Sequence, residues 1–171
     1  MAVFAQPVGA LTVYLVEAGM ANYIYVVVWD DGCLVVDPAE AEPVSKLAAQ
    51  LGMSPSAILV THHHGDHVGG VLQLKRSYGC EVVGPAGSRI RGLDREIGEG
   101  DHVVAGPLDF EVMETPGHTA TDISYHDPGA GLLFCGDTMF SAGCGRLFEC
   151  GPDVMWKSLQ RLRGLPGRTR V

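Results

Sequence analysis

The chain has few cations, few aromatic residues and no long apolar run. Its 171 residues include 12 Lys and Arg against 20 Asp and Glu, which gives a formal net charge of -8. This balance argues against binding to nucleic acid or to an anionic membrane, and it suits a site that holds divalent cations. The longest apolar stretch, residues 23–29, is far too short to cross a bilayer and predicts a buried strand.

The sequence also lacks paired cysteines and a basic leader. Its five cysteines are scattered, with no C-x-x-C pair, which argues against a disulfide framework or a zinc knuckle. Reduced thiols fit a cytoplasmic protein best. The first basic residue is Lys46, so a secretory signal peptide is not expected. The length and the 46% of hydrophobic residues are those of one globular domain, expected over residues 1–171.

The order of the predicted elements describes an α/β protein. Strands are expected at residues 11–16, 22–29, 33–36, 57–60 and 81–83, with helices at residues 43–51 and 68–78. Further strands at residues 102–104, 108–114, 122–126 and 132–135 precede a helix over residues 152–163. Strands and helices followed by strands and a helix indicate two sheets packed face to face with helices outside.

The strongest chemical signal is the histidine-rich segment 61–67, Thr-His-His-His-Gly-Asp-His. His62 and His64 project to the same side of an extended segment because side chains alternate. The glycine lets the chain turn sharply, so that Asp66 and His67 open the next helix and face back toward the pair. Imidazole and carboxylate ligands together suit zinc, iron or manganese.

Two residues at later strand ends extend this cluster. His118 lies in the tight turn 115–119, Thr-Pro-Gly-His-Thr, and Asp137 follows an apolar strand in the segment 136–138, Gly-Asp-Thr. A carboxylate in such a place can bridge two cations through its two oxygens. Taken alone, each residue is more readily explained as a turn residue or a helix cap. Together with the histidine-rich segment, they indicate a metal site.

Other acidic and imidazole side chains are expected outside the ligand set. By alternation His63 points away from its neighbours, while His102 and His126 lie beside turns and are expected to be solvated. Asp37 precedes Pro38 at the end of the third predicted strand. It is either a turn residue or a hydrogen-bond partner of a ligand imidazole, and the sequence leaves both interpretations open.

These motifs resemble those of the metallo-β-lactamase-fold hydrolases. The patterns H-x-H-x-D-H, T-P-G-H-T and G-D-T carry the likeness, which extends over essentially the whole chain. Residues 22–25, 35–38 and above all 142–149, Ala-Gly-Cys-Gly-Arg-Leu-Phe-Glu, make it closer still to glyoxalase II, the hydroxyacylglutathione hydrolases. The resemblance implies an αββα sandwich and a metal-dependent thioester hydrolase. Its substrate would be S-lactoylglutathione, which it would convert to lactate and glutathione in methylglyoxal detoxification.

The resemblance also implies a role for each residue of the cluster. His62, His64 and His118 would bind one divalent metal ion, and Asp66 and His67 the second. Zinc is expected first, with iron or manganese as alternatives. Asp137 would bridge the two metal ions. Asp137 and Asp66 are the expected catalytic residues, and Asp66 would orient the nucleophile.

The segment around Arg146 is similar to the glutathione-binding loop of the family. Arg146 stands where many members carry Lys, and Phe148 where many carry Tyr, so the cation is kept and one hydroxyl is lost. An ordinary surface charge is the alternative interpretation of Arg146. The expected partner is a small glutathione thioester bound by a monomer.

The sequence departs from the family at its C-terminal end. Family members continue with a strand that carries another histidine, a ligand of the second metal, and with a helical region; here no histidine follows His126. Residues 1–171 are therefore expected to form an incomplete catalytic domain with a weakened second metal site.

Two other functions remain open. One is another enzyme on the same fold, such as a mononuclear iron persulfide dioxygenase, a lactonase or a phosphodiesterase. The other is an inactive fragment that binds metal.

Overall fold

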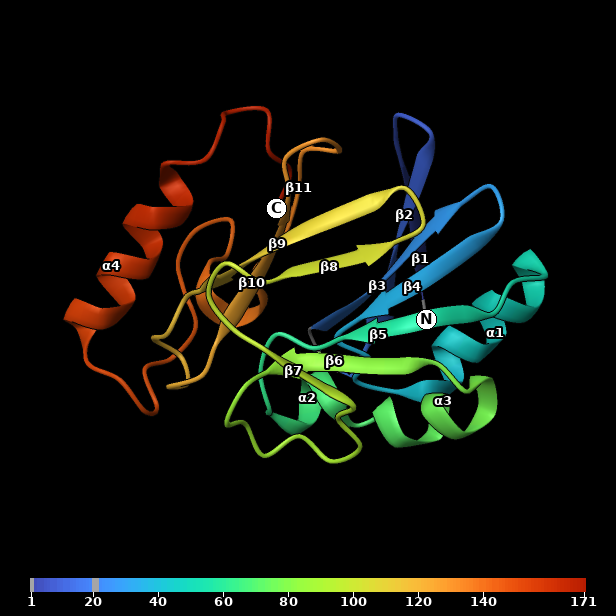
Figure 1. Cartoon of the computed structure of the whole chain (residues 1–171), viewed down its shortest axis with the longest axis horizontal. Coiled ribbons are helices and arrows are strands. Elements are labelled where there is room, and N and C mark those ends of the chain that lie inside the picture. The colour runs from blue at the N-terminus through green and yellow to red at the C-terminus, as the bar shows by residue number, and fades with distance from the viewer. Residues whose placement is uncertain (1, 20–21) are drawn as a thin grey trace.

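Two β-sheets pack face to face in the computed structural model, which describes residues 2–19 and 22–171 (Figure 1). The larger sheet has seven strands in sequential order: β1 Val3–Val8, β2 Leu11–Ala18, β3 Asn22–Trp29, β4 Gly32–Val36, β5 Pro55–Leu59, β6 Glu81–Pro85 and β7 Arg95–Ile97. The smaller sheet has the order β11-β10-β9-β8, with β8 His102–Ala105, β9 Leu108–Glu114, β10 Ile123–Asp127 and β11 Leu132–Phe134. Strands β1 to β4 are antiparallel and β4 to β7 are parallel, while the smaller sheet is antiparallel throughout.

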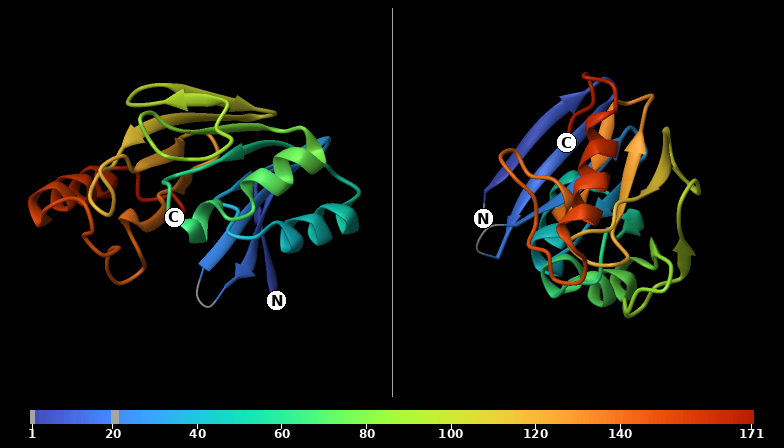
Figure 2. Two further views of the ribbon diagram at one scale, coloured as in Figure 1. Left: turned by 90° about the horizontal axis from the view of Figure 1, so that it is seen from below. Right: turned by 90° about the vertical axis from the view of Figure 1, so that its left-hand side faces the viewer.

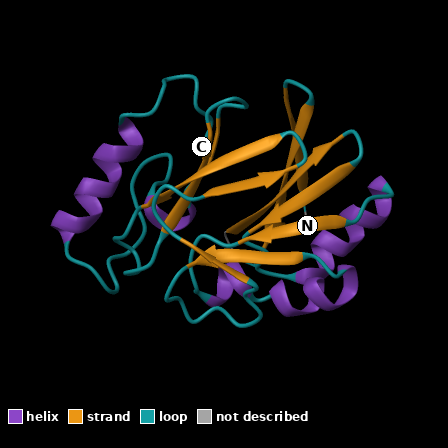
Figure 3. Cartoon of the chain, viewed as in Figure 1, coloured by secondary structure: helices purple, strands orange, loops and turns teal. Residues whose placement is uncertain are grey.

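Helices cover the outer faces of both sheets. They are α1 Ala41–Leu51, α2 Gly65–Val68, α3 Val71–Tyr78 and α4 Pro152–Arg163, with a short 3-10 helix, η1, at Gly136–Thr138. Helices α1 and α3 lie side by side against the larger sheet, and α4 lies at the other end of the molecule (Figures 2 and 3). The layers therefore follow the order helix, sheet, sheet, helix, which confirms the α/β sandwich.

The central strands are buried on both faces, which explains their continuous apolar runs. Leu34 and Leu59 point into the core between the sheets, whereas Val35 and Ile58 point into a second core beneath α1 and α3. Each fully buried aliphatic side chain of this kind contributes about 1.5–3 kcal/mol. Strands β4 and β5 are thereby fixed in register, and the loops at their carboxyl ends start from rigid positions.

The structure corrects the prediction of one helix over residues 68–78. The helix is broken at Gly69 and Gly70 into α2 and α3. A Cβ on Gly70 would lie 2.6 Å from the carbonyl carbon of Glu40, and one on Gly69 would lie 2.4 Å from the carbonyl oxygen of Ala39. The backbone before α1 thus passes directly against the glycines, and α2 becomes a separate turn that carries two of the predicted ligands.

Strands β1 and β7 were not among the predicted elements. Five of the six residues of β1 are exposed, and β7 has only three residues, so neither offers a clear apolar alternation. None of the helices formed by residues 2–19 and 22–171 has both the length and the hydropathy needed to cross a bilayer.

Candidate metal centre

The structure brings five of the six predicted ligands together from loops at one edge of the sandwich. His62 and His64 follow β5, His67 lies in α2, His118 lies between β9 and β10, and Asp137 lies in η1. Their potential ligand atoms form two groups whose members all lie within 4.8 Å of one another. One group is His62, His64 and His118, and the other is His62, His67 and Asp137. The two groups share His62.

In the first group, the hydrogen bonds of His118 fix which ring nitrogen faces the site. Nδ1 of His118 lies 2.7 Å from the carbonyl oxygen of Arg146, which can only accept, so Nδ1 carries the proton. Nε2 then faces inward and lies 2.8 Å from Nδ1 of His64. The rings of His64 and His118 stand edge to face, with centroids 4.6 Å apart. Two ring nitrogens so close together suit a shared cation.

His62 is oriented by a buried chain of hydrogen bonds. The hydroxyl of Thr61 donates to Oδ2 of Asp37 at 2.6 Å, and it therefore accepts from Nδ1 of His62 at 3.1 Å. Nε2 of His62 is left without a hydrogen-bond partner among the described residues, although it is buried. A buried nitrogen without a partner lowers stability, and a metal cation would satisfy it because a neutral imidazole donates its lone pair to metals.

His67 shows the same arrangement in the second group. Its Nδ1 donates to Oδ2 of Asp37 at 2.9 Å, and its buried Nε2 makes no well-aligned hydrogen bond within the described part of the chain, although Oδ1 of Asp137 lies 3.3 Å from it. Imidazoles that bind metals are held in this way through their outer nitrogen. The residues present therefore fit a metal ion at each group.

Asp137 faces both groups with different oxygens. Its Oδ1 lies 3.3 Å from Nε2 of His67, and its Oδ2 lies 3.3 Å from Nε2 of His118. The carboxylate thus contacts one histidine of each group.

The structure confirms the hydrogen bond between Asp37 and an imidazole of the cluster. Asp37 is 4% exposed and also accepts from the backbone N–H of Thr61 at 2.8 Å. Its φ is 48°, and among the described residues it is the one non-glycine residue with a positive φ. This conformation costs about 1–3 kcal/mol, so the surrounding contacts must hold it in place. Asp37 is a turn residue and a hydrogen-bond partner at once.

The electrostatic environment favours positive charge beside Asp137. Burial lowers the pKa of His67, but the carboxylates of Asp37 and Asp137 outweigh it and raise that pKa to about 10. Burial and the neighbouring imidazoles lower the pKa of His62, so its Nε2 lone pair is free at neutral pH. Burial opposes ionisation of Asp137, yet His67 and His118 lower its pKa below the ordinary value. These groups favour a cation at the centre, whether a proton or a metal ion.

Asp66 is the predicted ligand that belongs to neither group. It is exposed, and its carboxylate Oδ2 accepts a hydrogen bond of 2.8 Å from Nδ2 of Asn22. It nevertheless lines the same cavity of about 570 Å³ as His64, His118 and Asp137. The sequence placed Asn22 in a motif shared with a known family but gave it no role at the site.

Segment 142–149 forms one wall of that cavity. Gly145 approaches so closely that a Cβ would lie 2.4 Å from the carbonyl oxygen of Asp137 and 2.8 Å from Nδ1 of His118. Phe148 is 62% exposed, and its ring centroid lies 5.3 Å from that of His118 and 5.5 Å from that of His64. Arg146 is exposed at the rim of the cavity, and its backbone carbonyl holds His118.

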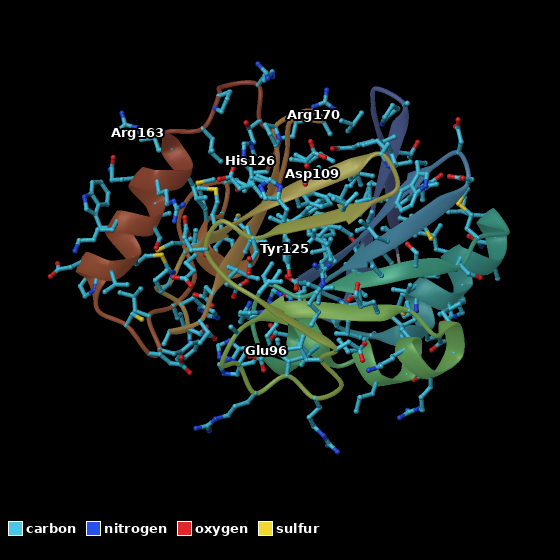
Figure 4. The ribbon with its side chains drawn as sticks, in the orientation of Figure 1. Glu96, Asp109, Tyr125, His126, Arg163 and Arg170 are labelled. Atoms are coloured by element: carbon cyan, nitrogen blue, oxygen red, sulfur yellow. The ribbon has the colours of Figure 1, made fainter. Side chains whose placement is uncertain are left out.

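The structure corrects one expectation for the remaining histidines. His126 is 5% exposed rather than solvated, and its position on β10 is labelled in Figure 4. Its partner in register is Leu133, which packs with Leu162 of α4, so α4 covers this outer face of the smaller sheet. His102 is exposed as expected, and His63 lies 3.6 Å from Glu149, outside both groups.

The chain is similar to known proteins over most of its length. The chain is 50% identical over 154 residues to a hydroxyacylglutathione hydrolase of Rhodospirillum rubrum, covering 88% of this chain and 60% of that protein. It is 45% identical over 163 residues to a hydroxyacylglutathione hydrolase of Idiomarina loihiensis, covering 94% of this chain and 64% of that protein. The chain thus spans roughly three fifths of the length of these relatives.

Solved structures show the same architecture. BLEG-1 B3 metallo-beta-lactamase superposes with a TM-score of 0.81 at 25% identity, covering 91% of this chain and 87% of that one. TTHA1623 in a di-iron-bound form superposes with a TM-score of 0.77 at 29% identity, covering 89% and 86%. The profile of the family described as Metallo-beta-lactamase superfamily matches residues 18–171. The chain belongs to the metallo-beta-lactamase superfamily.

Proposed function

We propose that this chain carries the metal centre of a hydroxyacylglutathione hydrolase, a thioester hydrolase that converts S-lactoylglutathione to lactate and glutathione. The observation that carries the proposal is the position of Asp137, whose Oδ1 lies 3.3 Å from Nε2 of His67 and whose Oδ2 lies 3.3 Å from Nε2 of His118, one histidine from each group. That arrangement suits two cations, and the relatives at 45–50% identity carry the name hydroxyacylglutathione hydrolase.

The proposed ligands divide between two divalent cations. His62, His64 and His118 would hold the first, and Asp66 and His67 would hold the second. Asp137 would contact both and, with Asp66, would orient the attacking water. Zinc is the first choice on the ligand types, and iron or manganese would fit the same donors. When bound, such cations polarise a carbonyl oxygen and acidify water, which is the chemistry that thioester hydrolysis needs.

Arg146 and Phe148 would bind the glutathione part of the substrate. Both are exposed at the cavity that His64, His118 and Asp137 also line. Glutathione carries carboxylates that a guanidinium recognises, and the ring of Phe148 offers an apolar surface beside the reacting group. The leaving thiolate needs no dedicated general acid because a thiol has a pKa far below that of an alcohol.

A mononuclear iron enzyme of the persulfide dioxygenase kind is the second candidate. It is favoured by the first group, in which His62, His64 and His118 form a complete set of three imidazoles without any acidic residue. Asp66 lies outside both groups, as a site for a single metal would allow. Dependence of turnover on oxygen would distinguish this enzyme from a hydrolase.

We also propose that residues 1–171 form part of a catalytic domain that acts as a monomer in the cytoplasm on a small thioester. All five cysteines lie within the described residues and are unpaired, which suits a reducing compartment. The net charge of -8 supports neither a nucleic acid nor an anionic membrane as a partner.

Hydrolysis of S-lactoylglutathione by the metal-loaded chain tests the proposal. We expect release of glutathione thiol that is equal with and without oxygen and that is abolished by Asp137→Asn. The variant keeps the shape of the side chain but removes the charge that two cations need. Turnover that requires oxygen would favour the mononuclear iron enzyme, and no turnover by fully loaded protein would contradict the hydrolase.

A further inference from the structure

Asn22 makes two hydrogen bonds to Asp66 from a distant part of the chain. Its side-chain Nδ2 donates to Oδ2 of Asp66 at 2.8 Å and to the backbone carbonyl of the same residue at 3.1 Å. The two residues are 44 positions apart in the sequence. One amide thus fixes both the main chain and the carboxylate of Asp66.

Helix α2 is anchored through the hydrogen bond of His67 to Asp37, but that contact does not orient the Asp66 side chain. Helix α2 has four residues, and no side chain caps its N-terminus. Asp66 is exposed, and its side chain makes no other hydrogen bond within residues 2–19 and 22–171. An exposed carboxylate on a single helical turn samples several rotamers unless a partner selects one.

Asn22, by contrast, is attached to a rigid element. It is the first residue of β3 and pairs in register with Ala18 of β2. Two residues further along, Ile24 is fully buried in the core beneath α1 and α3. The amide is therefore a donor held by the sheet, and it selects one orientation of the exposed carboxylate.

We propose that Asn22 is a positioning residue that holds Asp66 in the orientation of a metal ligand. The proposal rests on the proposed function, which assigns Asp66 to the second cation. With Oδ2 bonded to the amide, Oδ1 makes no hydrogen bond to any described residue and stays available in the cavity shared with His64 and Asp137. A neutral amide suits this task because it orients the carboxylate and leaves the negative charge that attracts a cation. A lysine in its place would cancel that charge.

The test is a stepwise titration with Co²⁺, monitored by the visible absorption of the bound metal, on four main proteins and two further variants. The four main proteins are the unaltered chain, Asn22→Ala, Asp66→Asn and the double variant. Gln73→Ala is the matched control, because Gln73 is an exposed amide on α3. We expect Asn22→Ala to weaken the affinity for the second cation about 10–100-fold, the range typical of residues that orient a metal ligand. The affinity for the first cation should not change. Asn22→Asp, which removes the donor and keeps the shape, should weaken it at least as much.

The double variant separates positioning from a general structural role. If Asn22 acts through Asp66, the double variant binds the second cation no more weakly than Asp66→Asn alone. Equal losses from Asn22→Ala in both backgrounds, or second-cation binding unchanged in Asn22→Ala or in Asp66→Asn, would overturn the proposal. Thioester turnover is measured separately on the unaltered chain, so loss of the hydrolase assignment would not be confused with loss of this one.

Discussion

The three-histidine group and the Asp66 side of the centre are anchored by different kinds of contact. In the first, the hydroxyl of buried Thr61 and the backbone carbonyl of Arg146 hold the outer nitrogens of His62 and His118. On the other side, Asp66 is exposed and depends on a single amide. The comparison indicates that hydrogen bonds orient the first group before any cation binds. In the second site, Asp66 is exposed to solvent and relies on Asn22 for its orientation.

His67 and Asp37 connect the two sides. Asp37 accepts from Thr61, which orients His62, and also from His67. One buried carboxylate therefore supports both groups of ligand atoms. A change at Asp37 should affect both cations, whereas a change at Asn22 should affect one.

Removal of a histidine from the first group should have the largest effect. We expect His118→Ala to weaken the affinity for the first cation more than about 100-fold, because a ligand itself is lost. This exceeds the loss expected when only a residue that orients a ligand is removed. Thioester turnover should be lost with it. Metal content after dialysis and competition with a chelator measure the change.

The control for that variant is His102→Ala. His102 is exposed and pairs with Asp109, far from the ligand atoms, so metal content should not change. If His118→Ala kept the first cation as tightly as His102→Ala, the three-histidine group could not be the metal site.

Substitution of Asp37 should come next, with an effect on both sides. Asp37→Ala leaves the buried donors of Thr61 and His67 without an acceptor, at about 1–3 kcal/mol for each unsatisfied group. We expect a lower free energy of unfolding in urea with chelator present, and affinity for both cations reduced about 10–100-fold.

Asp37→Gly separates the strain from the hydrogen bonds. Glycine adopts the φ of 48° readily, so this variant should be more stable than Asp37→Ala by about 1 kcal/mol, with the same loss of metal. Equal stability of the two variants would show that the left-handed backbone carries no strain.

Arg146 should give the smallest effect on the metals. Its side chain lies at the rim of the cavity, and only its backbone carbonyl contacts His118. We expect Arg146→Ala to raise KM for S-lactoylglutathione about 5-fold, equivalent to about 1 kcal/mol, and to leave metal content unchanged. Arg146→Lys should keep most of the binding, and a drop in metal content for Arg146→Ala would mean that the side chain organises the centre.

The local parts of the fold and site could be predicted from the sequence. The strands on either side of Asp30 and the helix over residues 152–163 follow from apolar periodicity and turn residues, and the structure confirms them. The H-x-H-x-D-H pattern could be recognised because extended alternation and one turn bring His62, His64 and His67 together within a few residues.

The remaining features depend on contacts between distant segments. The break at Gly69 and Gly70 arises because the backbone before α1 lies against them. Burial of His126 depends on α4, and the bond from Asn22 to Asp66 depends on where β3 begins in space. The residue pattern of a single segment does not predict such contacts between distant segments.

The most direct test of the account is the number of cations bound per chain and their separate affinities, measured on metal-free protein titrated with Zn²⁺ against a competing chelator. We predict two sites of unequal affinity: a tight one that is lost in His118→Ala, and a weaker one whose affinity falls further in Asp66→Asn. A single site unaffected by Asp66→Asn, or two sites that both survive His118→Ala, would contradict the two-cation centre bridged by Asp137.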